Sequence, residues 1–359
     1  MAKYYLENMP QADEAMDRVL SWYNGDPVDR PPVRFSEHNG RHNIDLKSII
    51  AQYDSTKDFW FDSDMQLKMF TDGIEGKRIY GETFPVYYPN LGPSLLASYY
   101  GVPLEYAEVT SWAKHTVDDF SEWDVDGLQL DRQCENWKKI DEMSLQALDA
   151  SKDRFFVGYP DLHPGLDFIA DFTGVENLCM ALCEEPDKVK RILQKVCDDF
   201  FDVFYYYDRL LEGQPSVSWL GIPFEGTMHI PSSDFSAMLS TELFEEFALP
   251  ITRRETDEFD YNIFHVDGPG LVRHIDKILE IDKIKAIQLV QGVGDDEPIM
   301  QWIPFIEKVV AKGKGVIVGL QKEELKDFAA NISPKGLYIT LAADNEEQED
   351  IVRFLENWK

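Results

Sequence analysis

The sequence is poor in cysteine and in basic residues. It has 4 cysteines in 359 residues, and none of them forms a Cys-x-x-Cys pair. Lys and Arg total 35 against 66 for Asp and Glu, so the formal net charge is −31. A surface of this charge repels the phosphates of nucleic acids and of anionic membranes, and we expect neither as a partner. The sparse cysteines indicate a reduced, cytoplasmic protein.

The chain also lacks long apolar runs and two common phosphate-binding motifs. No apolar run approaches the roughly 18 residues of a membrane helix, and residues 1–18 are too polar for a secretory signal. Neither G-x-G-x-x-G after a strand nor G-x-x-x-x-G-K-[S/T] is found. A small anionic substrate stays compatible with the charge, because a pocket can be locally basic inside an acidic shell.

What is present is an alternation of apolar, β-rich runs with amphipathic helical segments. The predicted strands cover residues 31–35, 84–88, 155–159, 217–222, 262–266, 286–290, 315–320 and 337–341, and helices are predicted between them, for example over 186–211, 241–259, 271–279 and 299–312. This alternation predicts an α/β fold. Eight strands with polar residues just after them favour a single (β/α)8 TIM-type barrel over an open doubly wound sheet.

The remaining segments fit around this barrel. Residues 13–23 predict an N-terminal helical extension that ends at Asn24-Gly25, and residues 346–358 predict a closing helix. Residues 113–150 are acidic and weakly periodic, which indicates an insertion or cap on the barrel. We therefore expect one domain over residues 1–359.

His265 and Asp267 are the most informative pair. They end a predicted strand two residues apart, so their side chains point to the same face, and Gly268 and Gly270 then let the chain turn. A barrel of this type builds its active site from such strand ends. The ordinary alternative is a helix-capping Asp beside a hydrogen-bonded His.

Further polar side chains follow the other predicted strands. They are Glu37, His38 and Arg41 after the first strand, Tyr159, Asp161, His163 and Asp167 after the third, Trp219, Glu225, His229 and Asp234 after the fourth, and Gln288 and Gln291 on the strand after His265. Carboxylates and imidazoles in one cleft suit acid–base chemistry or metal ligation. Helix capping, loop positions or plain core packing are the alternatives for several of them.

Several stretches together resemble the uroporphyrinogen decarboxylase superfamily, which includes zinc-dependent, corrinoid-linked methyltransferases. They are residues 18–20 with 25–33, residues 158–163 with 166–167, residues 234–240, and His265-x-Asp267-Gly268, which falls where the methyltransferases have His-x-Cys-Gly. The resemblance implies a barrel that moves a methyl group between a small substrate and a corrinoid on a separate protein. It also implies zinc or another divalent metal as a cofactor.

The sequence departs from the family at the metal ligands and at the first strand. Asp267 replaces the first Cys, and no Cys occurs after residue 197, so a thiolate zinc site is excluded in that form. A nitrogen and oxygen site remains, with His265, Asp267 and a third ligand such as Glu37, His38 or Asp344. The decarboxylase loop resembles Arg-Gln-Ala-Gly-Arg, whereas residues 37–41 read Glu-His-Asn-Gly-Arg.

The first expectation is thus a methyltransferase-like enzyme. His265 and Asp267 would bind the metal or act in its place, and Asp161 and His163 would orient the substrate and transfer protons. A second hypothesis is an acid–base lyase, isomerase or hydrolase acting on a polar, sugar-like small molecule. A decarboxylase and a non-catalytic ligand-binding barrel are the further alternatives.

Overall fold

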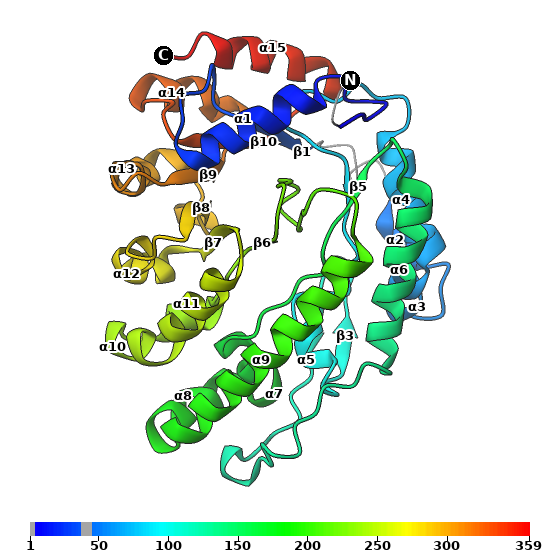
Figure 1. Ribbon diagram of the computed structural model, residues 1–359, viewed down its shortest axis with the longest axis vertical. Helices are drawn as coiled ribbons and strands as arrows, with labels where there is room; N and C mark the ends of the chain where they lie inside the picture. Colours follow the sequence, from blue (N-terminus) through cyan, green and yellow to red (C-terminus); the bar gives the residue numbers. More distant parts are fainter. Residues whose placement is uncertain (1–3, 37–44) are drawn as a thin grey trace.

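The computed structural model describes residues 4–36 and 45–359 and shows an α/β fold built around one curled parallel sheet (Figure 1). The sheet has six strands in the order β1 (Val33–Ser36), β10 (Leu337–Ala342), β9 (Gly315–Gly319), β8 (Ile284–Val290), β7 (Tyr261–Asp267) and β6 (Met228–His229). A separate parallel pair joins β2 (Val86–Tyr87) to β5 (Phe156–Val157), and β3 (Leu104–Tyr106) pairs antiparallel with β4 (Ser111–Ala113).

Helices cover the outer side of the curled sheet (Figure 1). They include α9 (Pro186–Leu210), α11 (Leu249–Glu258), α12 (Ile275–Leu279), α13 (Ile303–Ala311), α14 (Leu325–Asn331) and α15 (Asn345–Glu356). Every residue of β9 except Gly319 is buried, as expected for a parallel strand that is covered on both faces. No helix in the described ranges is both long and apolar enough to cross a bilayer.

Most of the predicted elements are confirmed, but the eight-stranded ladder is not formed by the described residues. The predicted strands at 84–88 and 155–159 shrink to the two-residue ladder of β2 and β5. The prediction for 217–222 is wrong, because these residues make a turn closed by a 2.9 Å hydrogen bond from Gly221 N to Ser218 O. Gly221 has a φ of 66°, which an extended strand does not allow. The turn still contacts the β5 region through Tyr159 N and Val217 O at 2.8 Å.

Helix α1 (Ala12–Asn24) is the predicted N-terminal extension and it closes the amino end of the sheet. It ends at Gly25, whose left-handed φ of 76° lets its N–H reach back to the carbonyl of Trp22. The indole of Trp22 donates to Gly336 O at 2.9 Å, and the Tyr23 hydroxyl accepts from Asn262 N at 2.7 Å. Because α1 covers the amino end of the sheet, the polar side chains that follow the strands gather at the carboxyl end.

A buried ionic network fixes the entry into β1. Glu82 is fully buried and accepts hydrogen bonds from the guanidinium groups of Arg30 and Arg18 and from Val33 N. The distances lie between 2.6 and 2.9 Å. Two cations and a backbone N–H therefore compensate one buried carboxylate.

The segment expected to form an insertion contains α6 (Glu135–Ser151), which lies beside α4 (Ser63–Ile74) in the outer layer (Figure 1). Gln146 Nε2 donates to Asp64 Oδ1 at 3.1 Å across this contact. Before α6, Trp123 stacks on Phe172 of α7 (Leu166–Thr173), with 4.9 Å between ring centroids.

Candidate active site

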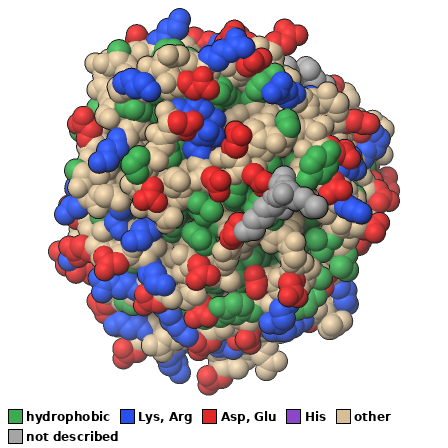
Figure 2. All heavy atoms as spheres, turned by 45° about the horizontal axis from the view of Figure 1, so that its top comes forward, with side chains coloured by type: hydrophobic (Ala, Val, Ile, Leu, Met, Phe, Trp, Pro, Cys, Tyr) green, Lys and Arg blue, Asp and Glu red, His purple; other side chains and the backbone are tan. Residues whose placement is uncertain are grey.

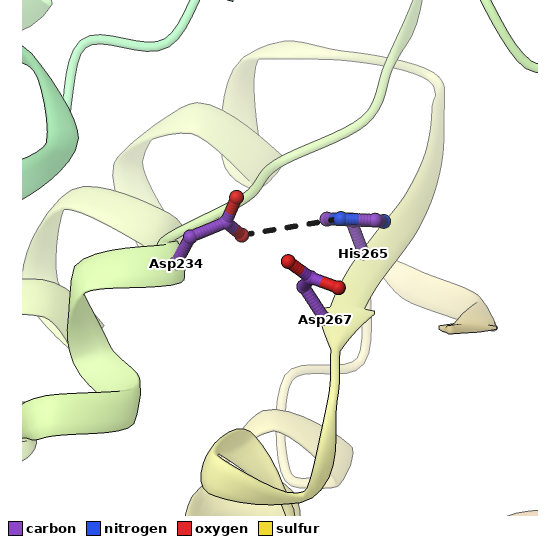
Figure 3. A group of neighbouring side chains, drawn as sticks. All are labelled: Asp234, His265 and Asp267. Carbon is purple, nitrogen blue, oxygen red and sulfur yellow. Dashed lines mark ion pairs between the residues drawn. The ribbon is translucent and has the colours of Figure 1, made fainter. Parts of the chain in front are cut away.

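Three potential metal-ligating side chains meet at the carboxyl end of β7. His265 and Asp267 come from the strand itself, and Asp234 begins the short 3₁₀ helix η2 (Asp234–Met238). One ligand atom from each residue lies within 4.8 Å of the others, and His265 Nε2 is 3.9 Å from Asp234 Oδ1. Figure 3 shows the three side chains pointing toward one another. The expected pair is thus joined by Asp234, one of the polar side chains that follow the fourth predicted strand.

The neighbouring strand orients the His265 ring. His265 pairs with Gln288 in the β7–β8 register, and Nδ1 of His265 hydrogen bonds to Oε1 of Gln288. Because an amide oxygen only accepts, Nδ1 carries the proton and Nε2 keeps its lone pair on the side of Asp234. Trp219 packs its ring edge-on against His265, with 5.4 Å between centroids. Such an outer partner is the usual support of a metal-bound histidine.

The two carboxylates of this cluster interact unfavourably in the absence of a cation. Burial raises the pKa of Asp267, and the negative charge of Asp234 raises it further, whereas His265 opposes the shift. Oδ1 of Asp234, the oxygen that lies 3.9 Å from His265 Nε2, also accepts from Ser232 Oγ at 2.8 Å. A divalent ion would neutralise both carboxylates at once.

The donor set fits a divalent metal of the nitrogen and oxygen type. One imidazole and two carboxylates are common ligands of zinc and of harder ions such as manganese. The four cysteines lie at or within helices on the outside of the sheet, so thiolates do not contribute. The expected third ligand Asp344 is not in this cluster, and Glu37, His38 and Arg41 lie outside the described residues.

A second polar centre is formed by Asp161 and His163. His163 Nε2 lies 2.8 Å from Asp161 Oδ1. Burial alone would lower the pKa of His163, but the charge and hydrogen bond of Asp161, assisted by Asp167 and Asp234, raise it to about 10. Nδ1 of His163 is buried and has no hydrogen-bond partner in the described part of the chain. The Asp161 carboxylate therefore favours the protonated form of His163, whose Nδ1 has no acceptor among the described residues.

Asp167 connects the two centres. Its carboxylate accepts from Asp234 N at 3.0 Å and from Phe235 N at 2.7 Å, so it caps η2 from a different helix. Burial and the nearby charge of Asp234 raise the pKa of Asp167 to about 6. Its contacts identify Asp167 as a residue that positions Asp234.

Four of the predicted residues make their contacts away from the Asp234 cluster. Tyr159 donates to Asp208 on α9 at 2.6 Å, and His229 pairs with Glu255 on α11 at 2.8 Å. Glu225 accepts from Tyr4 at 3.1 Å and lines a hollow with residues near the amino end of β7. Gln291 Nε2 donates to Gly319 O at the end of β9. Tyr159 and His229 thus connect the strands to the helical layer.

Sequence reasoning missed Arg34, although a charged residue between Val33 and Phe35 in a strand was a visible signal. Arg34 lines a cavity of about 360 Å³ that Thr83, Tyr88 and Asn90 also border. Its Nε is enclosed and has no hydrogen-bond partner, and no ion pair joins it to a carboxylate of the described chain. Burial lowers the pKa of this guanidinium.

Comparison with known proteins supports the fold. No protein-family model matches this chain, and no curated protein sequence matches it significantly. The fold is similar to solved structures, among them a methyltransferase from Methanosarcina mazei. That structure superposes with a TM-score of 0.60 at 11% sequence identity, covering 94% of this chain and 97% of the other. An identity this low shows a shared fold, and activity has to be argued from the site.

Proposed function

We propose that the protein is a methyltransferase-like member of the uroporphyrinogen decarboxylase superfamily. It would move a methyl group between a small substrate and a corrinoid carried by a separate protein. The observation that carries this proposal is the cluster of Asp234, His265 and Asp267, with His265 held by Gln288. The fold shared with a protein named a methyltransferase adds support.

In this proposal Asp234, His265 and Asp267 hold a divalent metal. A metal held by these residues would supply Lewis acidity toward a hydroxyl, thiol or methyl ether of the substrate. Gln288 keeps Nε2 of His265 directed at the site, and Asp167 keeps Asp234 in place through the backbone of η2. Trp219 excludes water from one side of the His265 ring. Oxygen ligands in place of thiolates favour a hydroxyl or ether substrate over a thiol.

His163 is the proton donor of the proposed reaction. When a methyl group leaves a methyl ether, the substrate oxygen keeps the bonding electron pair and needs a proton. His163 is charged at neutral pH because of Asp161, and its Nδ1–H is unpaired among the described residues. In the reverse direction the Asp161–His163 pair accepts that proton from a hydroxyl.

The absorption spectrum of cobalamin tests methyl transfer. The protein, loaded with zinc or manganese, is mixed with cob(I)alamin and a panel of small methyl ethers, or with methylcobalamin and the matching alcohols and thiols. We expect the spectrum to convert between the two cobalamin forms with at least one substrate, and the rate to fall in Asp234→Asn. Failure of the whole panel in both directions, with metal bound, would count against methyl transfer.

A second candidate function follows from the Asp161–His163 pair alone. A charged histidine beside a carboxylate suits general acid catalysis by a lyase, isomerase or hydrolase on a polar, sugar-like molecule. This candidate predicts that polyols or glycosides raise the melting temperature of the metal-free protein, because a ligand that binds only the folded state stabilises it. An unchanged melting temperature with a broad panel of polyols and glycosides would exclude this second function.

A further inference from the structure

The guanidinium of Arg34 lies inside the fold without a counter-charge. The neighbouring Arg30 shows the usual arrangement, since it makes two hydrogen bonds of 2.8 and 2.9 Å to Glu82. Arg34 points elsewhere, toward the turn at residues 218–221, where a methyl group built on Gly221 would lie 3.1 Å from Arg34 Nε and 3.3 Å from Cζ. Arg34 is part-buried and its enclosed Nε has no acceptor, an arrangement that adds nothing to the stability of the fold.

The turn beside Arg34 carries two more donors without acceptors. Ser218 Oγ and Trp219 Nε1 are both buried and have no hydrogen-bond partner in the described ranges. The hydrogen bond from Gly221 N to Ser218 O places both residues in the same turn as Gly221, which packs against the guanidinium. An indole N–H and a guanidinium can only donate, and a hydroxyl can donate as well. A group of unpaired donors is complementary to a ligand that is rich in acceptors.

The donors of this group face two sides: Arg34 borders the cavity, whereas Ser218 and Trp219 line a small hollow beside Tyr159 and Asp161. Arg34 and Tyr88 line the same cavity, and the charge of Asp161 adds to the effect of burial in raising the pKa of Tyr88. On the other side, Trp219 contacts the ring of His265. One turn therefore lies between the unpaired guanidinium and the metal-ligating cluster.

We propose that Arg34 binds an anionic group of the substrate, a carboxylate or a phosphate, and that Ser218 contributes a further hydrogen bond. A guanidinium fork matches both kinds of anion. One unpaired cation among several carboxylates favours a substrate with one such group over a polycarboxylate. The claim that this anion belongs to a methyl-transfer substrate rests on the proposed function. The claim that Arg34 binds an anion does not depend on it.

Small anions test this site. Melting temperatures are measured in sodium phosphate, acetate and succinate, each against sodium chloride of equal ionic strength, and titration calorimetry follows for the best anion. We expect one of them to raise the melting temperature of the parent above the chloride baseline. Phosphate acting alone identifies a phosphate-bearing ligand, and acetate or succinate acting alone identifies a carboxylate. No effect of any of the three would overturn the proposal.

Two variants assign the effect to Arg34. In Arg34→Met the affinity for the anion falls by about tenfold or more, as expected for loss of a charge-assisted hydrogen bond. In anion-free chloride the same variant melts at or above the temperature of the parent, because it removes an enclosed Nε–H that has no acceptor. Arg209→Met makes the same charge change at an exposed position and keeps the anion effect. Equal anion binding in Arg34→Met, or a lower melting temperature in chloride, would contradict the inference.

A third variant separates this inference from the proposed function. Asp267→Asn removes one proposed metal ligand but leaves Arg34, Ser218 and Gly221 unchanged. We expect it to lose metal and to keep anion binding. If the parent binds no metal and still binds the anion through Arg34, the methyl-transfer mechanism fails and the anion site stands.

Discussion

The imidazole of His265 and the side-chain amide of Gln288 form a hydrogen bond across the β7–β8 ladder. The two residues are register partners, so their side chains leave the sheet on the same face. The amide oxygen assigns the proton of the ring to Nδ1 and directs Nε2 toward Asp234. Gln288, which the sequence placed among the candidate polar residues, therefore sets the tautomer of the proposed metal ligand.

The first prediction concerns Gln288. In Gln288→Ala the ring loses its orienting acceptor, and we expect metal affinity to fall by about 10- to 100-fold, as is typical for an outer partner of a ligating histidine. Competition with a chromophoric chelator measures the affinity. Gln301→Ala, an exposed glutamine that donates to Asp295 O, serves as the control and keeps the affinity of the parent. Equal affinity of the parent and Gln288→Ala would show that this contact does not support the site.

The second prediction concerns the pH dependence of stability and rests on His163. Its pKa in the folded state, about 10, lies above the 6.5 of an unperturbed histidine. Its charged form therefore stabilises the fold fully below pH 6.5, and this contribution disappears as the pH rises toward 10. We expect the parent to lose on the order of 4 kcal/mol of unfolding free energy from this residue over that range. Urea unfolding at several pH values measures it.

His163→Gln is the matching variant for this pH test. A glutamine cannot titrate, so the slope of stability between pH 6.5 and 10 should flatten. His115→Gln provides the control, since His115 is exposed and lies outside the Asp161 cluster. A slope in His163→Gln as steep as in the parent would argue against a charged His163 at neutral pH.

The third prediction concerns the fully buried Glu82. Glu82→Gln keeps the shape of the side chain but leaves Arg30 and Arg18 without their shared counter-charge. Breaking a buried ion pair on one side costs about 3–5 kcal/mol, and we expect a loss of that size in urea unfolding. Glu349→Gln removes a partner of an exposed pair on α15 and should change stability by less than about 1 kcal/mol. A loss at Glu82 no larger than at Glu349 would contradict the network.

The fourth prediction concerns Gly221, which has a positive φ and packs against Arg34. Gly221→Ala adds backbone strain of about 1–2 kcal/mol, displaces the guanidinium and weakens anion binding. Gly213→Ala is a matched control, because Gly213 also has a positive φ, 98°, but nothing lies within 4 Å of a methyl group there. It should show similar strain in thermal melting and unchanged anion binding. Similar anion affinities of Gly221→Ala and Gly213→Ala would show that Arg34 does not bind the anion.

The parts of the fold that the sequence predicts well are those set by local patterns. The alternation along β7 places His265 and Asp267 on one face, and Asn24-Gly25 marks the end of α1. The turn at 218–221 escaped prediction because its apolar residues resemble a strand, while the positive φ of Gly221 breaks the ladder. An apolar run predicts that a segment is buried better than it predicts whether the backbone is extended.

The site depends on contacts that local patterns do not encode. Asp234 is distant from His265 in the sequence, and Asp167 of α7 holds it near His265 by capping η2. Arg34 and Gly221 are far apart in the sequence but in contact in the fold, and no sequence pattern predicts this contact. Such pairings follow from tertiary packing, so residue types could suggest Asp234, His265 and Asp267 as candidates but not that Asp234 joins the other two.

Metal analysis tests the central claim most directly. Elemental mass spectrometry is run on the purified parent, before and after reconstitution with zinc or manganese, and on His265→Ala, Asp267→Ala and Asp234→Ala. Asp276→Ala, an exposed carboxylate that pairs with Lys308, serves as the control. The account predicts a near-stoichiometric divalent metal in the parent and the control, and its loss in the three site variants. A parent that stays empty after reconstitution, or site variants that keep the metal, would contradict it.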